Sequence, residues 1–491
     1  MCVSLSAMAS NTSVKNAEGV EIWYDFDSST NTASVTYKEN SYSSYNNEYT
    51  GEVVIPSTVT YEGEEYNVTS IGDEAFYYCY SLTSITLPEG VTSIGSSAFE
   101  DCYSLTSITL PKGVTEIGEW TFAHCYSLTS ITLPEGVTSI GNSAFRSCTA
   151  LTSITIPEGL KSIGNSAFFN CNALTSITIP EGVTTIGEDA FNLCYKLYEV
   201  YNKSDLTITA GSWNNGCVAY YAKDVYTDSE GESKLKTVGD YLFYVDGEDI
   251  ELIAYTGSET SITLPSDYEG KNYNIGDYAF YKCDALTSIT IPEGVTEIGD
   301  YAFYDCNSLT SITSKNATPP TIESFTTFYD VDNSIPVYVP KSSVDAYKSA
   351  KYWKNFTNIV GAYFVDVIAE NGTVEGAGAY EENAEATLTA TPTEGYKFVQ
   401  WSDGVTDNPR TVVVVSDTTF TAEFEIDDSP ISDIQTSDVN VRLIGNNIVV
   451  EGADDYTVYS ISGQNLGKVE SVERGIYIVV VNGKSYKIVA K

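Results

Sequence analysis

The stretch "LTSITLPEGVTSIGSSAFEDC", from Leu82 to Cys102, decides the fold because the chain repeats it many times. A near copy, "LTSITLPKGVTEIGEWTFAHC", ends at Cys125, 23 residues further on. A fixed period of this length is typical of proteins built from small units that stack on one another. Full copies end at eight cysteines: Cys79, Cys102, Cys125, Cys148, Cys171, Cys194, Cys283 and Cys306.

Each repeat predicts one coil of a solenoid. Apolar residues such as Ile108 alternate with hydroxyl residues such as Thr109, as in a short strand with one buried face. Pro111 then turns the chain, and Phe122 and Cys125, three apart, are expected on one face of a single helical turn. One such unit cannot bury its apolar side alone, so successive units must stack to form a continuous core.

This pattern resembles the leucine-rich repeats of the BspA type, which are found in bacterial surface proteins. The resemblance rests on the string L-x-x-I-x-L…A-F-x-x-C and covers roughly residues 50–360. The fold class expected for the chain is an α/β-type solenoid of short strands and single helical turns, mostly β, followed by two small all-β domains. The spacing is irregular between Cys194 and Cys283, and the inserted residues at 57–72 and 268–274 predict hairpins that project from the coil.

Residues 363–425 change to an alternating, turn-rich pattern that predicts a small β domain. The motif formed by Gly395, Tyr396, Phe398 and Trp401 resembles the InlB B-repeat-like modules of bacterial surface proteins. We expect this domain to act as a spacer.

The last segment, 438–491, resembles the C-terminal sorting domain of the type IX secretion system of the Bacteroidota. Its acidic and basic residues balance, whereas the whole chain carries a net charge of −42, and such a break marks a module boundary. The resemblance implies recognition by the secretion machinery of the outer membrane. The sorting signal would then be carried by Gly463, Gly475, Tyr477, Lys487 and Lys491.

The start of the chain, "MCVSLSAMAS", places Ala7 and Ala9 in an A-x-A arrangement like the end of a secretory signal. The predicted organisation is a residual signal-like segment (1–17), an N-terminal β cap (18–70), the solenoid (71–313, with an irregular insert at about 195–275), its C-terminal cap (314–361), the InlB-like β domain (362–425), a linker (426–437) and the sorting domain (438–491). The C-terminal cap is expected to contain a helix from about Ser343.

The charge balance narrows the possible partners. The chain has 25 Lys and Arg against 67 Asp and Glu, so it is repelled by phosphate backbones and by anionic lipid. A nucleic-acid or membrane-surface role is therefore not expected, and no apolar run is long enough to span a bilayer. We expect a location outside the cell or at the outer-membrane cell surface.

The sequence contains few residues in patterns typical of catalytic or metal-binding sites. The one histidine, His124, occupies a slot that varies from repeat to repeat, which favours a solvated surface site. In parallel register the cysteine Cβ atoms all point the same way, so we expect free, buried, unreactive thiols, with a disulfide near Cys217 as the exception. No catalytic residue, metal site or cofactor is predicted, and the chain is not expected to be an enzyme.

The predicted surface has two different faces. The strand face repeats threonine and serine in nearly every coil, whereas the helical edge varies and is rich in the aromatic residues that anchor interfaces. The candidate ligand contacts on this edge are Tyr77, Tyr78, Trp120, His124, Tyr278, Tyr281, Tyr301 and Tyr304.

These observations favour a non-enzymatic, adhesin-like binding protein whose solenoid contacts host or bacterial proteins or glycans. A structural, self-associating surface protein is the alternative, and it would sediment as an assembly without any ligand. A hydrolase that uses two carboxylates is a third hypothesis, with acidic residues available but no recognisable pocket. The sequence does not identify the ligand.

Overall fold

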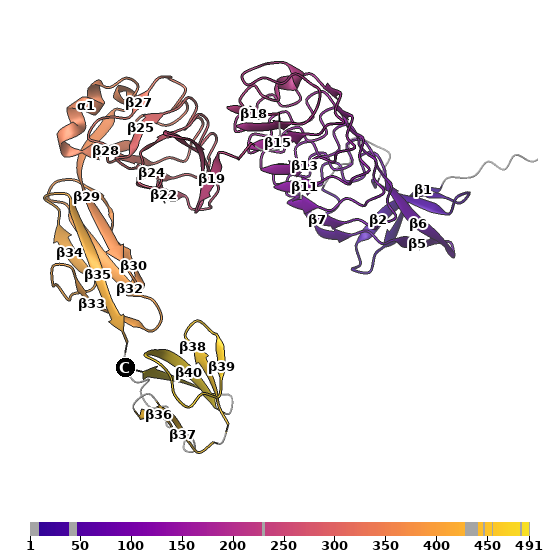
Figure 1. The fold of residues 1–491 in the computed structure, drawn as a ribbon. Helices are drawn as coiled ribbons and strands as arrows, with labels where there is room; N and C mark the ends of the chain where they lie inside the picture. Colours follow the sequence, from indigo (N-terminus) through magenta and orange to yellow (C-terminus); the bar gives the residue numbers. More distant parts are fainter. Residues whose placement is uncertain are drawn as a thin grey trace, which may run out of the picture.

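The computed structural model of the chain describes residues 9–38, 47–227, 231–427, 440–444, 447–453, 455–481 and 484–490. The predicted signal-like residues before position 9, most of the predicted linker, Cys2 and Lys491 lie outside these ranges. Figure 1 shows a coiled solenoid in two halves, followed by two small β units. Each half has its own hydrophobic core.

The solenoid begins with a β cap in which β3 and β6 pair in parallel and the other neighbouring strands pair antiparallel. The cap strands lie in the order β1-β2-β3-β6-β5, and β5 and β6 form the hairpin predicted for residues 57–72. Strand β8 of the first coil pairs in parallel with β6, so the cap passes directly into the coils. The bounds are β1 (Ala9–Lys15), β2 (Glu21–Asp27), β3 (Thr32–Thr36), β4 (Gly51–Val54), β5 (Thr58–Tyr61) and β6 (Glu64–Ile71).

The coils of the first half stack through two rows of parallel strands. Partners in neighbouring coils are 23 residues apart, as in the pairing of Ile131 with Ile154. One row comprises β7 (Leu82–Thr86), β9 (Ser107–Ile108), β11 (Ser130–Thr132), β13 (Ser153–Thr155), β15 (Ser176–Ile179), β17 (Glu199–Asn202) and β18 (Asp224–Tyr226). The other comprises β8 (Ser93–Ile94), β10 (Glu116–Ile117), β12 (Ser139–Ile140), β14 (Ser162–Ile163) and β16 (Thr185–Ile186).

The second half restarts the stack with an antiparallel pair of strands, β19–β20, joined to β21. Its first sheet contains β19 (Leu235–Val238), β20 (Tyr241–Asp246), β21 (Asp249–Tyr255), β23 (Tyr273–Ile275), β25 (Val295–Ile298) and β27 (Thr321–Ile322). Its second contains β22 (Ser261–Thr263), β24 (Ser288–Ile291), β26 (Ser311–Ser314), β28 (Pro336–Pro340) and β29 (Asn358–Ala369).

The repeats contain turns where single helical turns were predicted. In the described residues the only α-helix is α1 (Val344–Ser349), in the C-terminal cap. The turn at Phe122 is not helical because its N–H donates to Ala144 O of the next coil at 2.8 Å, whereas the Cys125 N–H donates within the turn to Phe122 O at 3.3 Å. Alternating donors of this kind form a third hydrogen-bonded ladder along the solenoid.

A column of phenylalanine rings fills the core, as the repeat predicted. Phe145 is fully buried, and its ring lies 5.4 Å from that of Phe122 and 5.2 Å from that of Phe168. Each half has its own column of rings: Tyr49 packs on the first ring of the column in the first half at 4.8 Å, and Trp353 packs on the last ring of the column in the second half at 5.5 Å. The caps therefore close the core as well as cover it.

The cysteine column lies beside these rings, and its thiols are hydrogen bonded. The Cys148 thiol donates to Phe122 O at 3.1 Å, and Cys171 repeats the contact with Phe145 O at the same distance. None of the nine cysteines in the described ranges forms a disulfide, so the disulfide predicted near Cys217 is wrong. Cys217 leaves the register of the column, because the Phe191 N–H donates to Gly216 O where the equivalent Phe168 N–H donates to Ala190 O. Its thiol lies near Asp189 and Trp213 O.

We expect these thiols to be unreactive in the native protein. Burial raises the pKa of both Cys79 and Cys194 to about 12, and it also raises the pKa of Cys102 and Cys125 in the coils between them. Because the thiolate is the reacting species, a thiol reagent at pH 8 should modify few of the nine cysteines before unfolding and all of them afterwards. Modification of most of them in native buffer would contradict the buried column.

Strand β29 joins the solenoid to the next unit. Its first residues pair with β28, and residues from Val365 onward pair with β35, so one strand crosses the boundary predicted at 361/362. The β unit that follows contains β30 (Gly372–Glu375), β31 (Gly378–Tyr380), β32 (Glu385–Pro392), β33 (Tyr396–Trp401), β34 (Arg410–Val413) and β35 (Thr418–Ile426). Its core includes the fully buried Trp401.

The C-terminal unit has a separate core and a sheet in the order β39-β38-β40-β41. Gly463 lies in the turn before β39 with φ of +82°, Gly475 and Tyr477 lie in β40, and Lys487 in β41 pairs with Ile478. The bounds are β36 (Asn440–Ile444), β37 (Asn447–Glu451), β38 (Thr457–Ser460), β39 (Asn465–Gly467), β40 (Gly475–Val481) and β41 (Lys484–Ala490).

Candidate functional site

An aromatic patch lies on the turn edge of the first half. Its rings touch in sequence, with 6.1 Å between the centroids of Tyr78 and Tyr103 and 5.0 Å between those of Tyr103 and Tyr126. His124 lies 6.0 Å from Tyr126 and 6.4 Å from Trp120. We call this set the N-terminal aromatic patch, and its members are Tyr77, Tyr78, Tyr80, Tyr103, Trp120, His124 and Tyr126.

The backbone holds several of these side chains away from the core. Tyr78, Trp120 and His124 have φ of +60°, +58° and +60°, a left-handed conformation that costs about 1–2 kcal/mol for an L-residue. Hydrogen bonds to the next coil offset this cost: the Trp120 N–H donates to Asn142 O at 2.9 Å and the His124 N–H to Arg146 O at 2.7 Å. The positions that vary along the repeat are therefore the ones that the fold turns outward.

His124 is less exposed than the predicted solvated site. Its Nδ1 lies 2.9 Å from Asp101 Oδ1, and 27% of its side chain is exposed. Glu100 completes a group whose ligand atoms lie within 4.8 Å of one another. The geometry gives the patch a polar rim, because the imidazole and two carboxylates lie beside the tyrosine rings.

The hydroxyls of Tyr103 and Tyr126 stay protonated at neutral pH. Burial, followed by the charge of Asp101, raises the pKa of Tyr103 and Tyr126. These side chains therefore offer hydroxyl groups that both donate and accept hydrogen bonds, together with flat apolar rings.

The second half carries a separate stack of tyrosines. Tyr281, Tyr304 and Tyr329 follow one another at 5.3 Å and 5.0 Å between ring centroids. Tyr301 lies beside this row, 5.6 Å from Tyr304. The structure thus groups the eight predicted contact residues on the turn edge, but in two separate clusters, one in each half.

Tyr278 joins the two halves and is less available than predicted. Its ring stacks on Tyr195 of the first half at 4.0 Å and on Tyr301 at 4.8 Å. Beside it the Lys196 ammonium donates to Ala279 O at 3.1 Å, and desolvation lowers the pKa of this lysine. We therefore assign Tyr278 to the junction between the halves, which the repeat pattern could not reveal.

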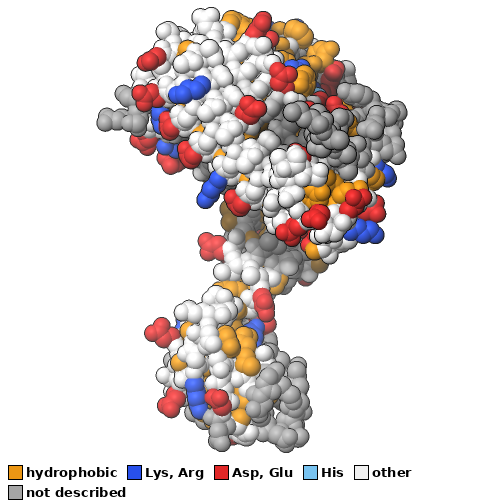
Figure 2. Space-filling model, turned by 90° about the vertical axis from the view of Figure 1, so that its right-hand side faces the viewer, with side chains coloured by type: hydrophobic (Ala, Val, Ile, Leu, Met, Phe, Trp, Pro, Cys, Tyr) orange, Lys and Arg blue, Asp and Glu red, His pale blue; other side chains and the backbone are white. Residues whose placement is uncertain are grey.

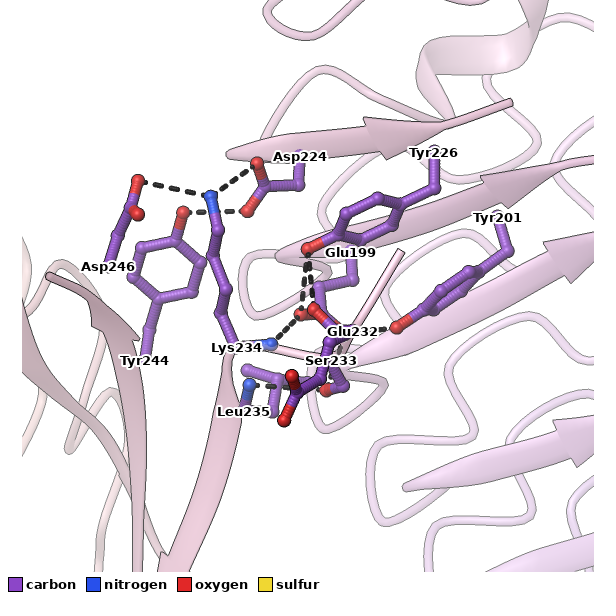
Figure 3. Close-up of polar contacts among 10 residues, drawn as sticks. All are labelled: Glu199, Tyr201, Asp224, Tyr226, Glu232, Ser233, Lys234, Leu235, Tyr244 and Asp246. Atoms are coloured by element: carbon purple, nitrogen blue, oxygen red, sulfur yellow. Dashed lines mark hydrogen bonds and ion pairs between the residues drawn. The ribbon is translucent and has the colours of Figure 1, made fainter. Parts of the chain in front are cut away.

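A polar network at the same junction holds the connection between the halves (Figure 3). The Glu199 carboxylate is 1% exposed and accepts hydrogen bonds from Tyr201, Ser233 and the Lys234 N–H at 2.9, 2.8 and 2.7 Å. The Tyr226 hydroxyl donates to the same carboxylate at 3.4 Å. Glu199 therefore fixes the segment that leaves the first half.

Lys234 continues this network into the second half. Its ammonium lies 2.9 Å from Asp224 in β18 and 3.0 Å from Asp246 in β20. The Tyr244 hydroxyl of β20 also donates to Asp224, at 2.7 Å (Figure 3). We call Glu199, Asp224, Lys234, Tyr244 and Asp246 the junction network. Because its residues come from both halves, it holds the two halves, and with them the two aromatic clusters, in a fixed relative position.

Three exposed tyrosines were missed by the sequence analysis. Tyr80, Tyr126 and Tyr329 are 42%, 43% and 43% exposed, more than Tyr78 at 37%. For Tyr80 and Tyr126 a signal was present, since tyrosine directly follows the repeat cysteine in the string "CYSLTS".

Acidic side chains do not gather into one patch on the face of the molecule in Figure 2. On the face in Figure 2 they are spread over the surface, with basic side chains between them. With a net charge of −42, this surface repels anionic partners. In the described part of the chain, no helix is long and apolar enough to cross a membrane.

Comparison with known families agrees with the repeat geometry. The model of the BspA type leucine rich repeat region matches residues 69–198 and 250–369, in six copies, which is just over half of the chain. The chain belongs to this family. A second model, the divergent InlB B-repeat domain, matches residues 363–428 of this BspA-type protein, so the two matches overlap within β29. The gap between the two BspA-type segments coincides with the junction between the halves.

Solved structures of three bacterial proteins are similar to this BspA-type chain. A leucine-rich repeat protein from Bacteroides ovatus is 26% identical over 71% of this chain and 83% of that one, with a TM-score of 0.37. A leucine rich cell surface protein from Faecalibacterium prausnitzii is 24% identical over 71% and 94%, with a TM-score of 0.32. The pneumococcal vaccine antigen PcpA is 19% identical over 72% and 99%, with a TM-score of 0.30. Among curated proteins, none matches the chain.

Proposed function

We propose that this BspA-type protein is a non-enzymatic, adhesin-like binding protein displayed at or released from the cell surface. The observation that carries the proposal is the N-terminal aromatic patch, where neighbouring coils hold seven ring side chains on one edge. Exposed aromatic side chains gathered in this way are typical of interaction sites. A protein or glycan outside the cell is the kind of ligand that suits this acidic, aromatic surface.

Removing two rings of the patch should abolish most binding without unfolding the coil. Tyr78→Ala combined with Trp120→Ala should weaken capture of a bound ligand at least about tenfold, since aromatic anchors carry much of the energy of an interface. Tyr78 is 37% exposed and Trp120 is outside the core, so the melting temperature should change little. Binding would be measured with the purified chain on arrays of matrix proteins and glycans.

A matched control lies on the strand face. Thr109 and Thr132 are exposed, and exchanging them for serine keeps the hydroxyl while removing a methyl group. This pair should bind like the parent protein. Loss of binding in the threonine pair with normal binding in the aromatic pair would place the site on the strand face and overturn the assignment to the edge.

We further propose that residues 438–491 are a type IX sorting domain and take no part in ligand binding. Support comes from the resemblance at the sequence level, the balanced charge of the segment and its separate hydrophobic core. Recognition by an outer-membrane translocon and removal near the 426–437 linker would follow.

Deletion of residues 438–491 should then trap a folded protein in the periplasm of the producing cell. Cell fractionation would locate the protein, and the purified deletion should bind ligand as the full chain does. Because the core of this segment is separate from those of the solenoid, the remainder should keep its melting temperature. Normal surface display of the deletion would refute the sorting role.

A further inference from the structure

A cleft of about 350 Å³ opens at the C-terminal end of the second half. It lies between the last coil and the residues that follow α1. Asn333 O accepts hydrogen bonds from the Thr357 N–H at 2.8 Å and from its hydroxyl at 3.2 Å, and the rings of Phe328 and Phe356 meet edge-on at 5.3 Å. These contacts fix both walls, so the cleft is formed before any ligand arrives.

Three aromatic side chains line the cleft near solvent. Phe325 is 65% exposed, Tyr329 is 43% exposed and Tyr352 is partly buried. Phe325 has the largest exposed fraction given for a hydrophobic side chain in the described residues. Because folding leaves this ring in contact with water, its burial contributes nothing to the stability of the fold. A flat apolar ligand would remove the ring from water.

The same cleft carries three unengaged polar side chains. Asp330, Asn333 and Asn355 are exposed, and the side chains of all three form no hydrogen bond with a described residue. Each amide can donate and accept at once, and the carboxylate can accept two hydrogen bonds. Adjacent hydroxyl groups on a ring are the ligand groups that match such side chains.

We propose that this cleft binds one unit of a neutral oligosaccharide. A pyranose ring has an apolar C–H face that packs on an aromatic ring and a rim of hydroxyls that bond amides and carboxylates. The volume lies in the range of small-ligand sites, which combine apolar walls with a few polar groups. The inference rests on the binding function proposed above and assigns it a second site and a ligand class.

A peptide fits the cleft less well. Peptides commonly bind by adding a strand to an exposed sheet edge, and β27 is the edge strand here. The cap already covers this edge, since Trp353 Nε1 donates to Pro320 O at 2.9 Å and Lys351 Nζ to Glu323 O at 2.9 Å. Two carbonyl groups that flank β27 are therefore already engaged, and the side chains that engage them stand where a peptide strand would add.

The charge of the cleft disfavours anionic sugars. The residues that line the cleft also favour binding of a glycan over its hydrolysis. The residues that line the cleft include Asp330 and no lysine or arginine, so a sialylated or sulfated glycan would meet repulsion without a counter-ion. Glycoside hydrolysis uses a pair of carboxyl groups, and the lining supplies one.

The test uses the purified full chain on an array of neutral, N-acetylated and sialylated oligosaccharides, followed by calorimetric titration of the best neutral one. We expect neutral glycans to bind and sialylated ones to be rejected. Phe325→Ala and Asn355→Ala should each weaken binding about tenfold, with unchanged melting temperatures because both side chains are exposed.

Trp213→Ala is the matched control, since Trp213 is 60% exposed, close to Phe325 at 65%, and lies outside both the cleft and the N-terminal aromatic patch. It should leave the affinity for the neutral glycan unchanged. Absence of neutral glycan binding, preference for sialylated glycans, or normal affinity in Phe325→Ala would each overturn the proposal. Ligand capture that depends on Tyr78 and Trp120 but not on Phe325 would refute this site while leaving the proposed binding function intact.

Discussion

Phe145→Ala should destabilise the protein by about 3–5 kcal/mol, the range for removing a buried phenylalanine from a core that cannot collapse around the space. Phe145 is fully buried, and its ring stacks on Phe122 and Phe168 in the two neighbouring coils. The backbone of those coils is tied by the hydrogen bonds of three ladders, so it cannot move inward. Because each coil contacts only its neighbours, the cavity weakens two interfaces at once.

Thr132→Ala, in the same coil, is the control. Thr132 is exposed in β11 and its hydroxyl bonds no described residue, so its loss should cost well under about 1 kcal/mol. Urea unfolding followed by circular dichroism measures both variants. Similar losses at the two positions would contradict the register that places Phe145 inside and Thr132 outside.

The repeat allowed much of the fold to be predicted, because repetition within one chain shows which positions are constrained. The isoleucine at the Ile131 position and the phenylalanine at the Phe145 position recur in the regular coils and lie in the core, whereas the threonine at the Thr132 position recurs on the exposed strand face. The left-handed turns could not be predicted in this way. They depend on hydrogen bonds between coils, such as that from His124 N–H to Arg146 O, and these exist only after stacking.

The junction escaped prediction for a similar reason. Tyr195 and Tyr278 are far apart in the chain, and no repeat phase relates them across the irregular insert. Glu199 did leave a signal, since it pairs in register with Ser176, where the repeat has a small hydroxyl residue. A carboxylate in that place needs several donors around it, and the insert supplies them.

Likewise, the boundary between the solenoid and the InlB-like unit was placed at a change of pattern. The change at residue 362 is real, yet β29 continues through it and pairs on either side with different strands. A strand of 12 residues that pairs with β28 of the solenoid and with β35 of the next unit makes a stiffer connection than a loop. The change in pattern therefore locates the new unit but does not show how firmly the two units are joined.

Glu199→Ala should separate the unfolding of the two solenoid halves. The substitution removes the acceptor of four hydrogen bonds and leaves the donors of Tyr201, Ser233 and Lys234 partly buried beside an empty space. Hydrogen bonds to a charged group contribute about 1.5–3 kcal/mol each, so the junction should lose ~3 kcal/mol or more. The halves have separate cores, and this network helps to couple them. Calorimetry should therefore show one transition in the parent protein and two in the variant.

The matched control is Glu158→Ala, which also removes a carboxylate. This carboxylate forms a surface ion pair with Lys203, and the side chains of Glu158 and Lys203 are 63% and 47% exposed. Surface pairs contribute about 0–1 kcal/mol, so this variant should unfold like the parent. Glu199→Gln should lie between them, because the amide retains one acceptor oxygen but turns an N–H₂ group toward partly buried donors. A Glu199→Ala protein that unfolds in one transition with the stability of Glu158→Ala would show that stacking of Tyr195 on Tyr278 is enough to couple the halves. If two transitions appear, the aromatic clusters of the two halves depend on Glu199 for their alignment. A ligand that contacts both clusters should then lose more affinity in Glu199→Ala than a ligand that contacts one cluster.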